Sequence, residues 1–390
     1  MILDLFAGPG GWSQGLRALG ARDVGVEWDR HAVATRTAAG HTSIHADVAA
    51  LDTTPFHGNV TGLIASPPCQ AWSMAGKRLG LVDQPLVHQA VADLARGDDT
   101  RATLLTACAD PRSLLAAEPV RYLKALRAHD GGPEWVAFEE VPDVLPLWRQ
   151  IAEILRAWDY SVWTGLLNAA DYGVPQTRRR AILLGSRTRT AQPPEPTHAE
   201  HPQPASLFGP GRQRWVSMAE ALGWGATDRP VPTVCAGGGP GGGPEPFPSG
   251  SRAALMRAQD LGAWVLRHNN QAHAAVRRLD QPAATLMFGN RANEARWTPT
   301  TPPPTNETTT NDAQPEPEAH APREDGPRSA SLRLTPSEAG VLQSFPADYP
   351  WQGNKGQVFS QIGNAVPPLL ARHLLAAHIP LTRDQLGLAA

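Results

Sequence analysis

The sequence has few cysteines and no long apolar run. Its 390 residues include three cysteines, Cys69, Cys108 and Cys235, which are far apart. Such scattered cysteines form neither a disulfide framework nor a paired-cysteine metal site, so we expect no bound metal and a reducing, cytoplasmic environment. No stretch approaches the ~20 apolar residues that span a membrane, and the opening MILDLFAGPGG lacks a basic leader. We therefore expect neither membrane association nor export.

Net charge is also small, at −2. This value argues against a protein coated with positive charge, although local basic patches remain compatible with it. Residues 251–297 carry seven arginines against three acids, whereas residues 298–330 carry six acids against two arginines. This contrast is typical of a polyanion-binding region followed by a linker, but it also fits ordinary solvated surface, and charge alone does not decide.

The first 190 residues alternate between strand and helix patterns. Apolar runs predict strands at residues 1–6, 23–28, 60–65, 134–138 and 180–186, and helical spacing predicts helices at 12–20, 30–39, 114–129 and 144–158. Pro119 must kink or restart the third of these helices. The alternation predicts an α/β fold, with a mostly parallel sheet covered by helices on both faces and a smaller irregular domain after it.

After about residue 190 this alternation is lost. Glycine and proline at 235–250 predict a loop, and the related DRPVPTV (228–234) and DQPAATL (280–286) each predict a turn that feeds a strand. Residues 298–330 are almost free of apolar side chains, so we expect disorder there. Regular structure is expected again at 332–345, and a final helix at about 366 to 377.

The turn after the first strand has the composition of a ligand-binding turn. DLFAGPGG places glycines at 8, 10 and 11, where a ligand can approach the backbone at the start of a helix. Glu27 ends the second strand, where a carboxylate can bind ribose hydroxyls, and Trp28 beside it could stack on an adenine. Asp47, in HADV at 45–48, follows the next strand along the chain in the same relative place. The GxGxxG pattern is absent, which disfavours a nicotinamide cofactor; turns with no ligand remain an alternative.

Five short motifs follow one another along the chain. They are FxGxG at 6–10, PPCQ at 67–70, a Glu-x-Val segment at 139–141, QxRxR at 176–180 and GNAVPP at 363–368. In this order and with these gaps, over residues 3–378, the sequence resembles the DNA (cytosine-5) methyltransferases of bacterial or phage type. The resemblance implies S-adenosylmethionine as the cofactor, a cytosine flipped out of duplex DNA as the substrate, and a covalent cysteine–C6 intermediate.

The resemblance also assigns residues. It makes Cys69 the nucleophile and Glu139 the acid that contacts the base, supported by Gln70, Gln176, Arg178 and Arg180. The implied cofactor-binding residues are Phe6, Gly8, Gly10, Glu27, Trp28, Asp47, Pro67, Asn364 and Val366. For DNA we assign Ser73, Lys77 and Arg78 after the cysteine, and Arg267, Arg277, Arg278 and Arg291 further on.

The resemblance predicts the organisation of the chain as well. Residues 1–189 would form the catalytic and cofactor-binding domain, 190–345 the target-recognition domain, and 346–390 a segment that returns to the catalytic domain. The expected partners are double-stranded DNA and a restriction endonuclease encoded separately, and the protein is expected to act as a monomer.

One position departs from the family pattern. The usual Glu-Asn-Val is Glu139-Glu140-Val141 here, and a carboxylate accepts hydrogen bonds but donates none unless it is protonated. Which glutamate faces the base is therefore open. The plainer alternatives are a buried small side chain for Cys69, a basic turn before an edge strand for 176–180, and a helix cap for Asn364. An RNA cytosine-5 methyltransferase or a DNA-binding protein with weakened catalysis are the rival functions.

Overall fold

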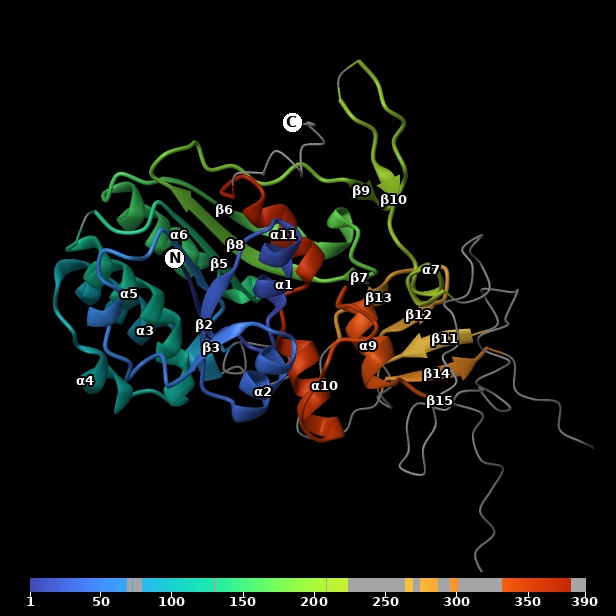
Figure 1. Ribbon diagram of the computed structural model, residues 1–390, viewed down its shortest axis with the longest axis horizontal. Coiled ribbons are helices and arrows are strands. Elements are labelled where there is room, and N and C mark those ends of the chain that lie inside the picture. The colour runs from blue at the N-terminus through green and yellow to red at the C-terminus, as the bar shows by residue number, and fades with distance from the viewer. Residues whose placement is uncertain are drawn as a thin grey trace, which may run out of the picture.

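A seven-stranded sheet forms the centre of the molecule (Figure 1). A computed structural model describes residues 1–68, 72, 79–129, 131–207, 209–223, 264–268, 274–286, 295–300 and 332–379. The strand order is β3–β2–β1–β4–β5–β8–β6. The strands are β1 (Ile2–Leu5), β2 (Asp23–Glu27), β3 (Thr42–His45), β4 (Gly62–Ala65), β5 (Trp135–Glu140), β6 (Ser161–Asn168) and β8 (Arg179–Ser186).

The first five strands in that order run parallel, and β8 is antiparallel to both of its neighbours. The expected mostly parallel α/β sheet is therefore confirmed. Among the helices that the structure describes, none is both long and apolar enough to cross a lipid bilayer.

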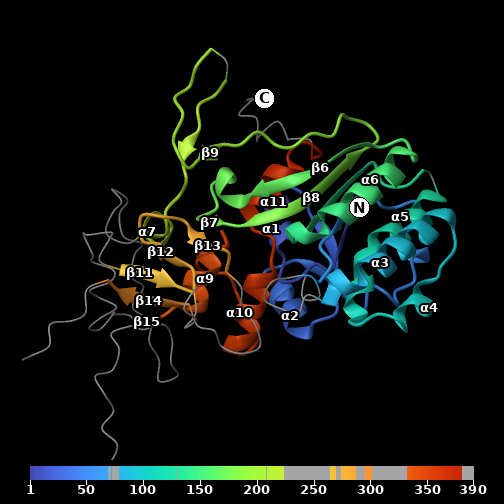
Figure 2. The ribbon, with the colours of Figure 1, turned by 180° about the vertical axis from the view of Figure 1, so that it is seen from behind.

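Both faces of the sheet are buried, and successive strand residues alternate between them. Leu3, Leu63 and Phe138 pack with α3 (Leu79–Arg96), α5 (Glu118–Arg127) and α6 (Leu145–Arg156). Their neighbours Ile2 and Ile64 pack with α1 (Gly11–Ala18) and α11 (Pro368–Leu375) on the other face. The two opposite views show α1 and α11 in front of the sheet in one and α6 in front in the other (Figure 1, Figure 2). A helix from the far end of the chain thus completes the core begun by the first strand.

The strands and helices expected before residue 190 are confirmed, with one interruption. Residues 111–117 form a 3₁₀ helix, and α5 restarts with Pro119 as its second residue, where a missing N–H costs nothing. Elements that the sequence did not predict include β6, α3, α4 (Arg101–Leu105) and α10 (Lys355–Asn364). The other elements of this part are α2 (Arg30–Ala38) and the 3₁₀ helices Thr54–Phe56, Pro142–Val144 and Ala169–Tyr172.

A second, smaller sheet has the order β12–β11–β14–β15. Its strands are Val276–Arg278, Trp264–Arg267, Arg296–Pro299 and Leu332–Arg333 in that order. Leu266 and Trp297 form a separate core with side chains from α7 (Met218–Leu222), α9 (Pro336–Leu342) and α10. The expected regular structure at 332–345 and the expected final helix are confirmed.

Disorder was expected from residue 298 onward, and this expectation was wrong for residues 298 and 299. Thr298 and Pro299 belong to β14 and pair with Val265 and Trp264, because pairing with a neighbouring strand stabilises them despite their polar composition. Residues 301–330 lie outside the described residues, as do 228–234 and 235–250. The turn expected at 280–286 is confirmed, and it feeds β13 (Ala283–Ala284).

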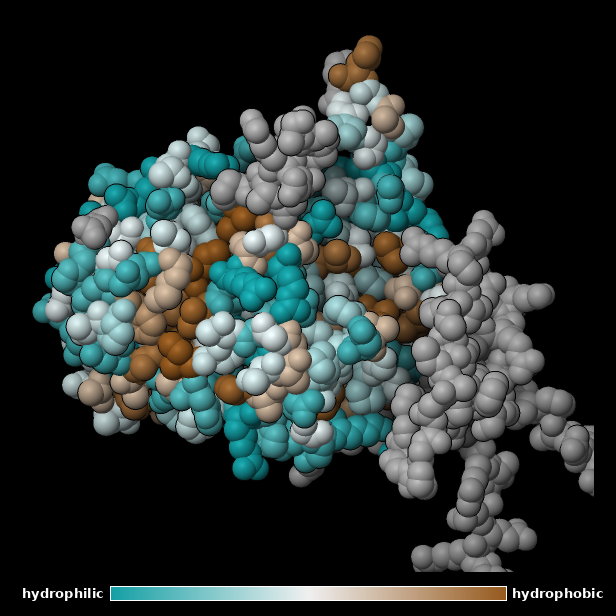
Figure 3. All heavy atoms as spheres, in the orientation of Figure 1, coloured by the Kyte–Doolittle hydropathy of each residue, from teal (hydrophilic) through white to brown (hydrophobic). Residues whose placement is uncertain are grey.

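One segment projects from the body of the molecule. It connects β9 (His198–Ala199) with β10 (Gln213–Arg214) and forms the tall loop in Figure 1. Its tip is hydrophobic in Figure 3. Leu207, in this segment, is fully exposed. This loop contributes little apolar burial, so the body of the fold does not depend on it.

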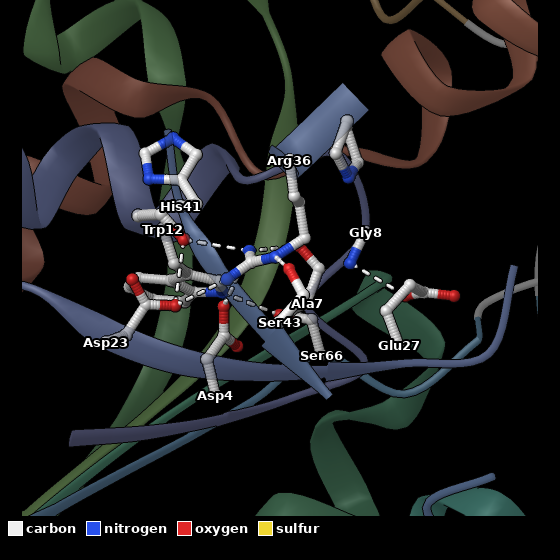
Figure 4. Close-up of polar contacts among 12 residues, drawn as sticks. Asp4, Ala7, Gly8, Trp12, Asp23, Glu27, Arg36, His41, Ser43 and Ser66 are labelled. Atoms are coloured by element: carbon white, nitrogen blue, oxygen red, sulfur yellow. Dashed lines mark hydrogen bonds and ion pairs between the residues drawn. The ribbon is translucent and has the colours of Figure 1, made fainter. Parts of the chain in front are cut away.

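The turn between β1 and α1 rests on a buried charge network (Figure 4). The fully buried Arg36, from α2, donates to Asp23 at 3.0 Å, to Ser13 at 2.8 Å and to the carbonyl of Ala7 at 3.4 Å, and one of its nitrogens lies 3.9 Å from the Asp4 carboxylate. Burial, together with the nearby Asp23, raises the pKa of Asp4 well above its usual range. A single guanidinium therefore holds the loop and compensates the acids of two strands.

The helix pair α1 and α11 packs unusually closely, because glycines face α11. A Cβ on Gly11 would lie 2.0 Å from the carbonyl oxygen of Val366, and one on Gly15 would lie 2.7 Å from the Cβ of Ala371. Gly11 thus serves the packing of the chain that leads into α11.

Replacing Gly11 by alanine is expected to lower the free energy of unfolding by about 1–3 kcal/mol, because the added methyl overlaps a backbone carbonyl that cannot move freely. Chemical denaturation measures the change. Gly356→Ala is the matched control. It adds the same methyl group in α10, where the nearest atom is Asn354 Oδ1 at an ordinary contact distance of 3.5 Å. This variant should be neutral or stabilising by up to about 1 kcal/mol. Equal effects of the two changes would contradict the close packing.

Arg36→Met is expected to destabilise the fold by about 3–5 kcal/mol, because it leaves buried carboxylates without their cation. Arg17→Met, which removes an exposed guanidinium that donates to the carbonyl of Ala39, should cost less than about 1 kcal/mol. Denaturant midpoints of both variants at neutral pH measure this difference, and an Arg36 variant as stable as the Arg17 variant would refute the role of the network.

Candidate active site

One large cavity, of about 760 Å³, opens at the carboxyl ends of the five parallel strands. Residues at or just after the end of each of these strands line the cavity. The lining residues that follow or end the strands are Phe6 and Gly8 after β1, Glu27 and Trp28 at β2, Asp47 after β3, Pro67 and Pro68 after β4, and Glu139 and Glu140 on β5. Ligands of open α/β sheets bind at this edge, so the cavity is the candidate active site.

One end of the cavity has the features of a nucleoside site. Gly8 has a φ of +53°, which favours glycine, and a Cβ there would meet no atom within 4 Å. Its N–H donates to Glu27 Oε2 at 2.8 Å, while the N–H groups of Trp28 and Asp29 donate to Oε1 at 2.9 and 2.7 Å. Burial raises the pKa of Glu27, and these three N–H groups oppose that rise. The carboxylate is fixed beside open backbone, and Trp28 is 73% exposed, so a flat group can stack on it.

Gly10 does not line the cavity. It caps the start of α1 with a φ of +102°, and a Cβ there would approach the His41 ring to 2.9 Å. Burial and the charges of Arg36 and Arg17 lower the pKa of His41 to about 4, so this ring stays neutral beside the turn. Gly10 therefore shapes the turn, whereas Gly8 offers open backbone to a ligand.

The other end of the cavity brings two acids together with two arginines. Glu139 is 5% exposed, and Arg180 Nε lies 3.0 Å from its Oε1. Arg178 is buried, lines the same cavity and donates to the carbonyl of Gly363 at 3.0 Å. Glu140 is also buried in the cavity wall; burial and the neighbouring Glu139 raise its pKa well above the usual range. Both glutamates reach the cavity, but only Glu139 pairs with Arg180 among the described residues.

Gln176 lies outside the cavity and joins distant parts of the chain. Its amide nitrogen donates to Gln343 Oε1 at 2.6 Å, and its oxygen accepts from the N–H of Leu286 at 3.2 Å. Gln343 in turn donates to the carbonyl of Ala365 at 2.7 Å. Gln176 and Thr177 form β7, which pairs with β13. The strand that follows, β8, lies inside the sheet, so the alternative of a basic turn before an edge strand was wrong.

The C-terminal segment supplies one more wall. Asn364 and Val366 both line the cavity. Asn364 is the last residue of α10, and the residue that caps α11 is Pro367, so Asn364 does not cap the final helix.

Sequence reasoning missed one part of the cavity wall. Asp99, Arg101 and Leu105, in and before α4, line the cavity. Arg101 pairs with Asp99 at 2.7 Å and with the buried Glu118. No local pattern marks α4 as part of a site. Pro111, Arg112, Leu114 and Leu115, in the DPRSLL stretch at 110–115, also line the cavity.

Several predicted site residues lie outside the described residues: Cys69, Gln70, Ser73, Lys77, Arg78 and Arg291. Arg267 lies on β11, and Arg277 and Arg278 lie on β12. Arg278 pairs with Asp280 at 3.1 Å. In the part of the chain that the structure describes, no three His, Cys, Asp or Glu side chains gather as a metal site requires.

The smaller sheet aligns arginines that are far apart in the sequence. Arg267 is directly opposite Arg296, and Arg296 is directly opposite Arg333 in the strand register. Residues in register share a face, and the adjoining row of Leu266 and Trp297 faces the core. The arginine row therefore lies on the face that points away from the core.

Comparison with known proteins agrees with this geometry. The family model of C-5 cytosine-specific DNA methylases matches residues 1–91, 101–216 and 259–379. The type II methyltransferase M.DdeI of Desulfomicrobium norvegicum is 26% identical, over 96% of this chain and 87% of its own length. M1.HphI of Haemophilus parahaemolyticus is 25% identical, over 98% and 87%.

Solved structures share the fold. The methyltransferase EhMeth of Entamoeba histolytica matches with a TM-score of 0.56 at 13% identity, over 96% of this chain and 98% of that one. The Dnmt2 methyltransferase of S. pombe matches with a TM-score of 0.52 at 13% identity, over 96% and 97%. The family model covers most of the chain and includes every strand of the central sheet, so this protein belongs to the C-5 cytosine-specific DNA methylase family.

Proposed function

We propose that this enzyme methylates C5 of a specific cytosine that has swung out of a DNA duplex, through a temporary bond between Cys69 and C6 of the ring. The observation that carries the proposal is the single cavity that connects the Gly8 and Glu27 end with Pro68, Glu139 and Arg180. A methyl donor and its acceptor must lie within reach of one another, and one shared cavity allows this.

The residues at the first end fit S-adenosylmethionine. Glu27 is placed to accept from ribose hydroxyls, the exposed Trp28 ring offers a stacking surface for adenine, and the open space at Gly8 admits a ligand beside the backbone. When bound, this cofactor supplies an electrophilic methyl group. The other residues proposed to hold it are Phe6, Asp47, Pro67, Asn364 and Val366, all of which line the cavity.

Cys69 is proposed as the nucleophile because of its place in the chain. It directly follows Pro67 and Pro68, which both line the cavity and restrict the backbone before it. Cytosine C5 is a poor nucleophile, and addition of a thiolate to C6 makes it enamine-like. A free cysteine has a pKa of ~8.5, so positive charge must favour the thiolate. Arg178 and Arg180, in the wall of the same cavity, supply such charge.

Glu139 is proposed to hold a proton at ring N3. As sulfur adds to C6, negative charge moves to N3, and a hydrogen bond from a carboxyl group there stabilises it. The contact of Arg180 with Glu139 at 3.0 Å fixes where this side chain lies. A base, for which a water molecule suffices, then takes the C5 proton, and the electrons of that C–H bond reform the C5=C6 double bond as the sulfur leaves as a thiolate.

DNA is proposed to bind across the smaller sheet. C6 cannot be reached inside a duplex, so the base must leave the stack. The aligned Arg267, Arg296 and Arg333 suit a row of phosphates. Arg277, Arg278 and Arg291 of the same region, and Ser73, Lys77 and Arg78 after the cysteine, remain predictions. We assign residues 190–345 to target recognition, and 1–189 with 346–390 to catalysis.

The relatives named type II methyltransferases suggest a biological setting. We propose that the enzyme acts as a monomer and protects duplex DNA from a separately encoded restriction endonuclease. Methyl transfer measured side by side on DNA and RNA duplexes tests DNA against the RNA alternative.

Cys69→Ser is expected to abolish methyl transfer and to leave cofactor affinity unchanged, because a serine hydroxyl does not ionise at neutral pH. A duplex with 5-fluorocytosine at the target position should trap the wild-type enzyme covalently, since fluorine cannot leave as a proton does. Gel shift under denaturing conditions measures the trapped complex.

Cys108→Ser is the matched control for this experiment. It makes the same change of atoms at a thiol whose pKa is raised by burial and by Asp83 and Asp110, and it should transfer methyl groups and form the adduct as the wild type does. Full activity of the Cys69 variant, or no adduct with wild-type enzyme, would refute the covalent mechanism.

Glu27→Ala is expected to weaken S-adenosylmethionine binding by about tenfold to a hundredfold, because hydrogen bonds from the ribose to a charged acceptor are lost. Isothermal titration calorimetry measures the affinity. Glu134→Ala, which removes an exposed glutamate, is the control and should bind normally. Unchanged affinity of a folded Glu27 variant would exclude this residue from the cofactor site.

A further inference from the structure

Glu140 is the acid that stands where the family usually has asparagine, and it follows a second acid, Glu139, at the end of one strand. Glu139 and Glu140 are the last two residues of β5, and both are in the cavity wall. The cation nearest to these acids pairs with Glu139, at 3.0 Å from Arg180 Nε to Oε1. Within the described residues no cation is in ion-pair contact with Glu140, which is 1% exposed. Two buried negative charges side by side would repel each other strongly.

The two oxygens of Glu140 differ in their surroundings. The N–H of Val141 donates to Oε2. Oε1 is buried and has no hydrogen-bond partner among the described residues. If the group is neutral, the hydrogen therefore belongs on Oε1, because Oε2 already accepts. An acid in that state presents one acceptor and one donor, as a side-chain amide does.

We propose that Glu140 is a neutral carboxylic acid in the resting enzyme, with its proton on Oε1, and that this O–H is a hydrogen-bond donor that positions the substrate in the active-site cavity. The family uses an amide at this position, and the protonated acid reproduces its pattern of one donor and one acceptor. Glu140 is a positioning residue, and this inference rests on the proposed function.

The groups that face Glu140 support the neutral form. Burial and Glu139 raise its pKa, while the N–H of Val141 and the charges of Arg180 and Arg178 oppose the rise without cancelling it. A group whose pKa is raised on folding stabilises the folded protein fully below its unfolded pKa, and this contribution is lost as the pH rises through the folded pKa. Wild-type stability should therefore fall with increasing pH relative to a variant that has no proton to lose there.

The first experiment compares wild type with Glu140→Gln by melting temperature between about pH 5 and about pH 9. The advantage of the glutamine variant should grow steadily with pH. Glu153→Gln, at an exposed position of α6, is the control and should show a constant difference. A constant difference for Glu140→Gln as well would overturn the neutral acid. This measurement uses no DNA and no turnover, so it stands even if the proposed function fails.

The second experiment separates the donor from the loss of charge. Glu140→Gln keeps a donor, whereas Glu140→Met is neutral, of similar length and has none. Single-turnover methyl transfer with saturating cofactor should be at least about tenfold faster for the glutamine variant than for the methionine variant. Cofactor affinity, measured by calorimetry, should be the same in both and shows that each is folded. Equal rates of the two variants would overturn the donor role, while a failure of the proposed function would appear as no fluorocytosine adduct in wild type.

Discussion

Buried hydrogen bonds that join residues 176–178 to residues 343–365 hold the candidate active site together. Gln176 donates to Gln343, Gln343 donates to the carbonyl of Ala365, and Arg178 donates to the carbonyl of Gly363. Buried polar groups need partners. Loss of any one of these hydrogen bonds would therefore leave a buried donor unsatisfied. They fix the start of β8, and thus Arg180 beside Glu139. They also bring the chain that contains Val366 to the wall of the cavity.

The nucleoside end depends on a comparable arrangement. Arg36 donates to the carbonyl of Ala7 in the turn after β1, and its positive charge lies beside the carboxyl groups of Asp23 and Asp4. These contacts hold the turn in one position. Gly8 then presents its N–H to Glu27. Buried ion pairs add little net stability compared with apolar packing but do specify one arrangement. Both ends of the cavity are thus set by buried polar contacts, while the apolar layers on the two faces of the sheet supply the stability.

The sequence allowed much of the fold to be predicted, because the strands of a parallel sheet are short apolar runs with distinctive spacing. Glycine turns and the paired prolines marked the strand ends where the cavity opens. Where prediction failed, the deciding contacts were distant. Thr298 and Pro299 look like part of a polar linker, yet they pair with β11. The sequence after Cys69 gave no sign that α3 would follow, and nothing local indicated that Arg101 lines the cavity.

Local chemistry fixed the identity of the groups: an acid at the end of β2, a cysteine after two prolines, and arginines before β8. Their roles relative to one another were decided only by the tertiary structure. Gln176 belongs to the scaffold rather than to the cavity wall, Arg267 and Arg333 share a row through strand register, and Glu140 is buried beside a second acid. The physical reason is that hydrogen-bond partners, register and burial depend on residues far away in the chain, whereas turn and strand preferences depend on neighbours.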